Sequence, residues 1–125
     1  MLFGITSEDV KSRKLVNPGW YRGRVEKIEE RPGKKDGAKV AWVFILGLNG
    51  DAEGVIFQRA FSEKAPAMAI PYIEAVLGRA IDEDGGSFDL NATIGEELNF
   101  YVKNKEWDGA MRNDVADFRA ISKNA

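Results

Sequence analysis

The sequence predicts a mainly β fold in which one short helical segment separates the third of five strands from the fourth. Three observations support this prediction. Five stretches show the two-residue alternation or the continuous apolar character of strands. Turns rich in Gly, Pro, Asn and Asp separate these stretches, and an apolar-rich stretch at residues 65–77 is the segment of the domain that we interpret as helical. A chain of 125 residues has the length of a single domain.

The first predicted strand covers residues 20–30. Apolar or small residues alternate with charged ones over residues 21–25, which is the pattern of a half-buried strand. The alternation then shifts phase, and a β-bulge near Lys27 would explain the shift. Gly23 in the middle of the strand predicts a sharp bend or a close approach of backbone.

Residues 39–48 and 55–61 are the second and third predicted strands. The second strand is apolar on both faces, which indicates that it is central in the fold or that one of its faces carries aromatic residues for a ligand. Residues 32–37 contain two glycines and form a polar hairpin connection before it. Asn49-Gly50 opens the next turn with the dipeptide most typical of hairpins.

The helical segment at residues 65–77 contains Pro71. Because proline interrupts a helix, we expect two short helices or one kinked helix, with Gly78 as the C-cap. An acidic loop at residues 82–87 and a short extended piece at residues 88–91 are expected to follow.

Residues 94–103 and 111–121 are the fourth and fifth predicted strands, and a turn at residues 107–109 joins them. Three strands, a helix and two further strands is the element order of the OB-fold, a small five-stranded Greek-key barrel. We therefore predict an OB-like barrel whose helix lies between strands three and four.

The predicted barrel occupies residues 17–125 and follows an N-terminal arm at residues 1–16. A short helix in the arm is expected to begin at Ser7, a good N-cap residue. The first residues lack the basic and apolar regions of a signal peptide. The longest apolar run, residues 40–46, is far shorter than a membrane helix requires. We expect no membrane association and a cytoplasmic protein, in the host cytoplasm if a phage encodes it.

The chain contains neither Cys nor His. This excludes disulfides, zinc sites, thiol nucleophiles and a histidine general base. The acidic residues at positions 82–89 lack the spacing of a calcium-binding loop. No phosphate-binding or dinucleotide-binding glycine motif is present. We expect a protein that is not an enzyme and that needs no metal or cofactor.

The net charge of −2 conceals a strong asymmetry along the chain. Residues 11–39 hold ten basic and four acidic residues, whereas residues 40–99 hold three basic and ten acidic ones. One interpretation is a face that binds a polyanion. The other is an ordinary solvated surface whose charges alternate locally.

Aromatic and basic residues are interleaved on the predicted strands. Proteins that bind single strands stack bases on aromatic rings and contact phosphates with Lys or Arg. The aromatic candidates for stacking are Trp20, Trp42, Phe57, Tyr101 and Trp107. The candidates for phosphate contacts are Arg22, Arg24, Lys34, Lys35, Lys39, Arg59, Lys103, Lys105 and Arg112. The alternative is that some of these aromatic residues, Trp42 and Phe57 among them, belong to the core.

Residues 103–118, KNKEWDGAMRNDVADF, resemble the end of a class of phage single-stranded DNA-binding proteins. Residues 18–21, the Lys/Gly-rich loop and the apolar second strand are similar to the earlier part of that class. The resemblance implies an OB-fold that binds single-stranded DNA with little sequence preference during replication or recombination. It also implies that Trp107, Arg112 and Asn113 of the turn and return strand, and the first-loop residues Lys34 and Lys35, contact DNA.

These observations lead to one main functional prediction. We expect sequence-tolerant binding and protection of single-stranded DNA, with other replication or recombination proteins as possible partners and a homodimer as a possible assembly. The alternative is a protein-interaction module with the same barrel, in which the aromatic residues form a partner interface. No recognition helix for duplex DNA is visible in the sequence.

Overall fold

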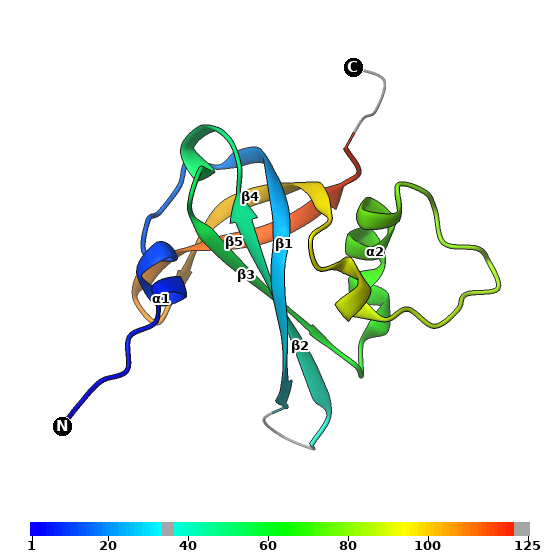
Figure 1. Cartoon of the computed structure of the whole chain (residues 1–125), viewed down its shortest axis with the longest axis horizontal. Coiled ribbons are helices and arrows are strands. Elements are labelled where there is room, and N and C mark those ends of the chain that lie inside the picture. The colour runs from blue at the N-terminus through cyan, green and yellow to red at the C-terminus, as the bar shows by residue number, and fades with distance from the viewer. Residues whose placement is uncertain (34–36, 122–125) are drawn as a thin grey trace.

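A computed structural model describes residues 1–33 and 37–121, and its centre is one five-stranded antiparallel sheet (Figure 1). The strands are β1 (Gly19–Pro32), β2 (Lys39–Gly47), β3 (Ile56–Ser62), β4 (Glu97–Trp107) and β5 (Ala110–Arg119). They lie in the order β3-β2-β1-β4-β5. The helices are α1 (Ser7–Lys11) and α2 (Ile70–Leu77), and short 3-10 turns cover Gly50–Ala52, Pro66–Ala69 and Leu90–Thr93. The five predicted strands, and a helix between the third and the fourth, are confirmed.

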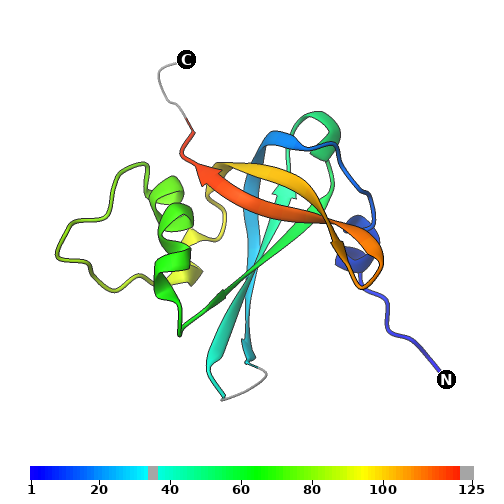
Figure 2. The ribbon, with the colours of Figure 1, turned by 180° about the vertical axis from the view of Figure 1, so that it is seen from behind.

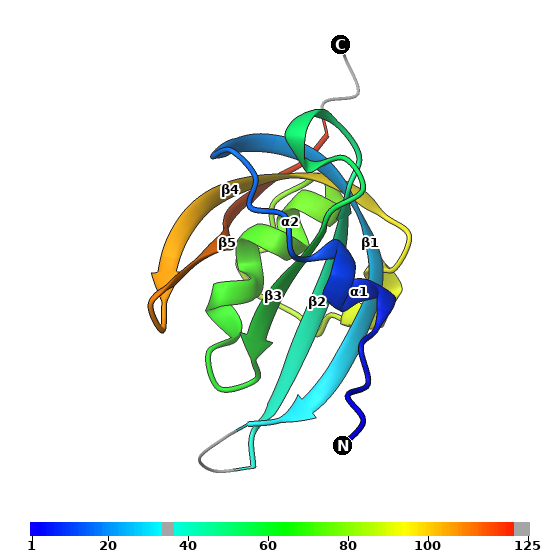
Figure 3. The same cartoon turned by 90° about the vertical axis from the view of Figure 1, so that its left-hand side faces the viewer.

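β1 is long enough to pair with two different strands. Residues 19–24 pair with β4, and residues 23–32 pair with β2. The register with β2 shifts between Val25 and Lys27, which confirms the predicted bulge. The sheet therefore turns around β1, and the two hairpins β1–β2 and β4–β5 leave the centre of the molecule in different directions (Figure 3).

Gly23 lies where β1 passes from its pairing with β4 to its pairing with β2. A β-carbon at this position would be 2.6 Å from both Ile45 Cγ2 and Phe100 Cε1. Real side chains do not approach so closely, so the packing of β1 between these two residues requires glycine. The predicted close approach of backbone is confirmed.

The two edge strands, β3 and β5, face each other across the core. Arg59 Nη1 of β3 donates a hydrogen bond of 2.7 Å to the carbonyl oxygen of Val115 in β5, and the rings of Phe61 and Phe118 lie 6.2 Å apart. Among the described residues no backbone pairing joins these strands, so the sheet is curled but not closed into a barrel.

The core lies on the inner side of the curled sheet and is completed by α2. Tyr72 of α2 packs against Phe61 and Phe118, with ring centroids 5.4 and 5.3 Å away. Its hydroxyl donates a hydrogen bond of 2.6 Å to Thr93 Oγ1, which in turn donates to the carbonyl oxygen of Leu90. This buried chain of hydrogen bonds connects α2 to the segment that precedes β4.

The helical segment divides into a 3-10 turn and an α-helix, as Pro71 predicts. The 3-10 turn Pro66–Ala69 leads into α2, in which Pro71 occupies the first turn, where no backbone donor is needed. Gly78 ends the helix with φ +74°, which confirms the predicted C-cap. The expected extended piece at residues 88–91 is wrong, because Leu90–Thr93 forms a 3-10 turn in which Asp89 caps the backbone of Asn91.

α1 begins at Ser7 as predicted, but its N-cap is Thr6 rather than Ser7, because Thr6 and Asp9 form a reciprocal capping box. β4 begins at Glu97, three residues later than expected, since Gly95 and Glu96 exchange backbone hydrogen bonds with Val25 before the strand starts. No helix within the described residues is long and apolar enough to cross a membrane.

Candidate nucleic-acid interface

The outer side of β1, β4 and β5 carries most of the predicted aromatic and basic residues that are exposed. The alternation of β4 buries Phe100 and Val102 in the core and directs the residues between and beyond them outward. We call this surface the hairpin face, because the β4–β5 hairpin forms its larger part (Figure 2). Its aromatic and basic members are Trp20, Arg22, Tyr101, Lys103, Lys105, Trp107, Arg112 and Arg119, and Glu97, Asp114 and Asp117 lie among them.

An aromatic pair occupies the end of the hairpin face nearest the centre of the sheet. Trp20 and Tyr101 are opposite each other on β1 and β4, with ring centroids 5.4 Å apart in an edge-to-face arrangement. Arg119 of β5 lies over the Trp20 ring, with Cζ 4.3 Å from the ring centroid. Trp20 remains 37% exposed. This group offers a flat π surface beside a guanidinium, which is the combination that stacking on a nucleobase uses.

Trp107 stands at the other end of the hairpin face, at the tip of the β4–β5 hairpin. Asp108 and Gly109 form the turn with φ values of +54° and +79°, as a two-residue hairpin turn of type I′ requires. This tight turn places Trp107 at the last position of β4, opposite Ala110. The Trp107 side chain is 60% exposed, and such a large apolar group at a hairpin tip is available to contact a ligand.

The cations between these aromatic ends differ in their pairing. Arg22 Nε lies 2.7 Å from Glu97 Oε1, and Lys103 Nζ lies 4.0 Å from Asp114 Oδ2. Lys105 and Arg112 are directly opposite each other across β4 and β5. Within the described residues neither of these two has a carboxylate within ion-pair distance. Like charges that face each other on a sheet destabilise it, so this pair gains from an anion placed between the two side chains.

Two further predicted cations, Arg24 of β1 and Lys39 of β2, are already neutralised by neighbouring carboxylates. Arg24 pairs with Glu26 at 2.8 Å, and Lys39 pairs with Glu30 at 3.1 Å. The hydrogen bond from Lys39 to Glu30 also raises the pKa of Lys39. These side chains do not join the hairpin face, and the structure does not bring them together with the aromatic residues there.

Trp42 is half-buried on the outer side of β2. Arg31 lies over its ring, with Cζ 5.2 Å from the ring centroid, and Arg31 is itself paired with Glu29. Arg31 and Lys27 both donate hydrogen bonds to the Glu29 carboxylate, and these bonds hold the pKa of Glu29 below its usual value. Trp42 therefore has a local partner of its own, away from the hairpin face.

The prediction that Phe57 stacks on a base is wrong. Its ring is 2% exposed and packs edge-to-face against Phe100 at 4.9 Å. A base cannot reach this ring unless the core opens. Arg59 is likewise committed within the fold, because it bridges β3 and β5 through the hydrogen bond to Val115.

Asn113 holds the N-terminal arm. Its Nδ2 donates a hydrogen bond of 2.7 Å to the carbonyl oxygen of Lys14, and its Oδ1 accepts one of 3.0 Å from the backbone of Val16. Val16 is buried in the core. Both functional ends of the Asn113 amide are thus used to fasten the arm to β5, which leaves them unavailable for a base.

Lys34 and Lys35 lie outside the described residues. Sequence reasoning missed Arg119, although its alternation with buried Phe118 on the last strand could have placed it on the outer face.

No group of three or more potential metal ligands occurs in the part of the chain that the structure describes. In the comparisons with known proteins, no family model matches the chain and no curated protein matches it.

Proposed function

We propose that this protein binds single-stranded DNA along the hairpin face, with little sequence preference. The observation that carries the proposal is the presence on one surface of two exposed aromatic rings, Trp20 and Trp107, and three cations. These cations have no carboxylate within ion-pair distance among the described residues: Lys105, Arg112 and Arg119. Successive outward residues of a strand lie about 7 Å apart, so bases and phosphates of an extended strand can be met in turn. Unstacked bases are accessible only in a single strand, so duplex DNA gains less from this surface.

The architecture supports the same proposal. We propose that the sheet is a partly open OB-like barrel, because its strand order and helix position match that fold and because OB-folds commonly bind oligonucleotides beside their β1–β2 and β4–β5 loops. The β4–β5 hairpin here carries Trp107 and the Lys105–Arg112 pair. The resemblance of residues 103–118 to phage single-stranded DNA-binding proteins supports a role in replication or recombination.

The test is a titration of tryptophan fluorescence with a thymine oligonucleotide of about 30 bases, beside a duplex of equal length. We expect quenching by the single strand that exceeds quenching by the duplex, and an affinity that falls as salt rises. Trp107→Ala should weaken single-strand binding by about 1–3 kcal/mol without lowering thermal stability.

Trp42→Ala is the matched control, because Trp42 is a tryptophan of the same sheet that lies away from the hairpin face and has Arg31 as its partner. Binding per folded molecule should stay unchanged in this variant. If neither strand type quenches the fluorescence or binds at low salt, the DNA proposal is wrong. The hairpin face would then be a candidate surface for a protein partner.

A further inference from the structure

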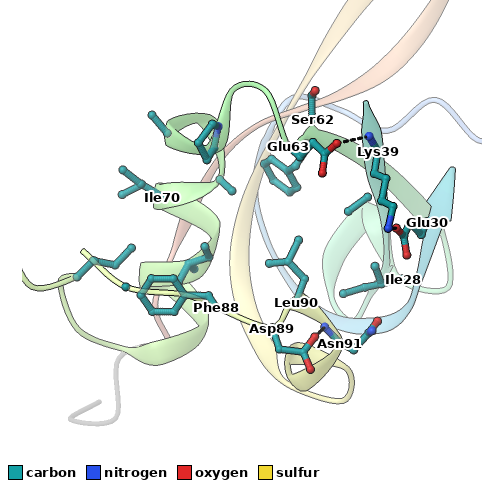
Figure 4. A pocket seen from close by; sticks show the side chains of 18 of the residues that line it. Ile28, Glu30, Lys39, Ser62, Glu63, Ile70, Phe88, Asp89, Leu90 and Asn91 are labelled. Atoms are coloured by element: carbon teal, nitrogen blue, oxygen red, sulfur yellow. Dashed lines mark hydrogen bonds and ion pairs between the residues drawn. The ribbon is translucent and has the colours of Figure 1, made fainter. Parts of the chain in front are cut away.

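An open groove lies between α2 and the far end of the β1–β2 hairpin, on the opposite side of the molecule from the N-terminus (Figure 1). It has a volume of about 870 Å³. Ile28, Ile70, Phe88 and Leu90 are among the residues that line this space (Figure 4). Ile70 and Phe88 are each 40% exposed. A surface hollow with this many apolar side chains is of the kind that a binding partner covers.

The N-terminal arm carries a matching apolar segment that its own chain leaves bare. Leu2, Phe3 and Ile5 are 99%, 77% and 72% exposed. The root of the arm is held firmly, because Lys14 pairs with Asp51 at 2.8 Å and Asn113 binds the backbone beyond it. Six residues precede α1, and an extended segment of this length reaches about 20 Å from the helix.

The two features do not meet in the structure, in which Leu2, Phe3 and Ile5 lie exposed outside the groove. The arm leaves the molecule on the side of α1, whereas the groove lies beside α2 (Figure 1). A second copy can bring them together. We propose that the apolar arm segment, residues 2–5, docks into the α2 groove of a second copy, and that two copies exchange arms reciprocally. This proposal is independent of DNA binding.

The buried area of such an exchange is that of a stable dimer. Leu2 and Ile5 would each bury roughly 100 Å², and Phe3 about 150 Å². The groove walls would bury a similar area, so two arms account for about 1,400 Å². Specific interfaces bury about 1,200–2,000 Å². A twofold arrangement with the same contact made twice also closes the assembly and prevents open-ended growth.

The charges around the two partners are complementary as well. Lys11 and Arg13 of the arm are exposed and have no carboxylate partner among the described residues. The groove is bordered by Glu63 and Asp89, and the acidic loop at residues 82–84 adjoins it. Opposite charges beside an apolar contact favour encounter and correct orientation.

The first test measures self-association by analytical ultracentrifugation. We expect a concentration-dependent dimer for the natural chain and a monomer for both Phe3→Ser and Ile70→Asp, which alter exposed side chains and so leave the fold intact. Met68→Ser is the matched control, since Met68 is 58% exposed beside the groove but does not line it. It should dimerise like the natural chain.

Mixing Phe3→Ser with Ile70→Asp should restore a weaker heterodimer, because one chain keeps its groove and the other keeps its arm. The absence of cysteine allows a second test. A short bismaleimide should link Gly4→Cys chains to Ala67→Cys chains, because both substitutions keep Phe3 and the apolar groove residues. It should not link Gly4→Cys chains to Met111→Cys chains, whose thiol is on the β4–β5 hairpin. A monomer at every concentration up to about 0.5 mM, or a dimer unaffected by Phe3→Ser and Ile70→Asp, would overturn the proposal.

Discussion

Removing one cation from the Lys105–Arg112 pair should weaken DNA binding and stabilise the fold at the same time. The two side chains face each other across β4 and β5 and have no carboxylate partner among the described residues. Two unit charges about 7 Å apart in water repel by about 0.6 kcal/mol. Screening at 0.15 M salt reduces this repulsion to about 0.2–0.3 kcal/mol. Arg112→Gln keeps most of the length of the side chain and removes the repulsion.

The assay has two parts. For a chain of this size the relief corresponds to a melting temperature higher by about 1 °C at 0.15 M salt, and the rise should be larger at low salt. The loss of one phosphate contact should lower single-strand affinity about fivefold at 0.1 M salt and reduce the slope of log K against log salt by about 0.7. Arg79→Gln is the matched control, because it removes the same charge from an exposed residue that follows the C-cap of α2.

The reasoning is refuted if Arg112→Gln melts at a clearly lower temperature than the natural chain, since Arg112 would then have a structural role. It is refuted equally if the variant binds DNA with unchanged affinity and salt slope. A change of the same size in Arg79→Gln would show that net charge matters rather than the position of the cation. Each of these outcomes is distinguishable in one pair of measurements.

Three further predictions concern the fold and are measured by chemical or thermal unfolding. Gly23→Ala should cost about 1–3 kcal/mol, because its β-carbon would be 2.6 Å from two core side chains; an unchanged stability would contradict the close approach. Burial raises the pKa of Tyr72 to about 12 in the folded protein, whereas the pKa of tyrosine in the unfolded chain is about 10. The free energy of unfolding is therefore unaffected by this group below pH 10 and falls by about 2 kcal/mol as pH rises towards 12. Tyr72→Phe should remove this fall, which leaves a smaller pH dependence than that of the natural chain. Asn113→Ala should free the arm, seen as faster amide exchange at Val16, with DNA affinity unchanged; a loss of affinity would return Asn113 to the interface.

The local features of the fold were predictable because they depend on residues close in sequence. The bulge near Lys27 followed from a broken alternation, and the ends of α2 followed from Pro71 and Gly78. Closure of the sheet was not predictable in this way. It depends on how β3 and β5 approach, and here a side chain, Arg59, spans the gap where a backbone ladder would be needed.

The sequence could predict which types of residue form the candidate site, but not which individual residues lie there. Alternation could not decide whether Phe57 faces the core or a ligand, because it shares one face of the third strand with both apolar Val55 and charged Arg59. The role of Asn113 depends on a contact with Lys14, 99 positions away along the chain. Which cations have a carboxylate partner likewise depends on the register between neighbouring strands, as the ion pair between Arg22 of β1 and Glu97 of β4 shows.

The two proposals together predict how affinity should depend on DNA length. The hairpin face and the α2 groove lie on different sides of the molecule, so an arm-exchanged dimer leaves both hairpin faces open (Figure 2). A strand of about 8 bases can occupy one copy, whereas about 30 bases can engage both. Linking two sites raises the affinity for the long strand by an effective-concentration term that the short strand does not receive. Phe3→Ser should therefore lose affinity for the long strand and keep its affinity for the short one, whereas Arg112→Gln should lose affinity for both. Equal losses for both lengths in Phe3→Ser would place the arm at the DNA interface itself.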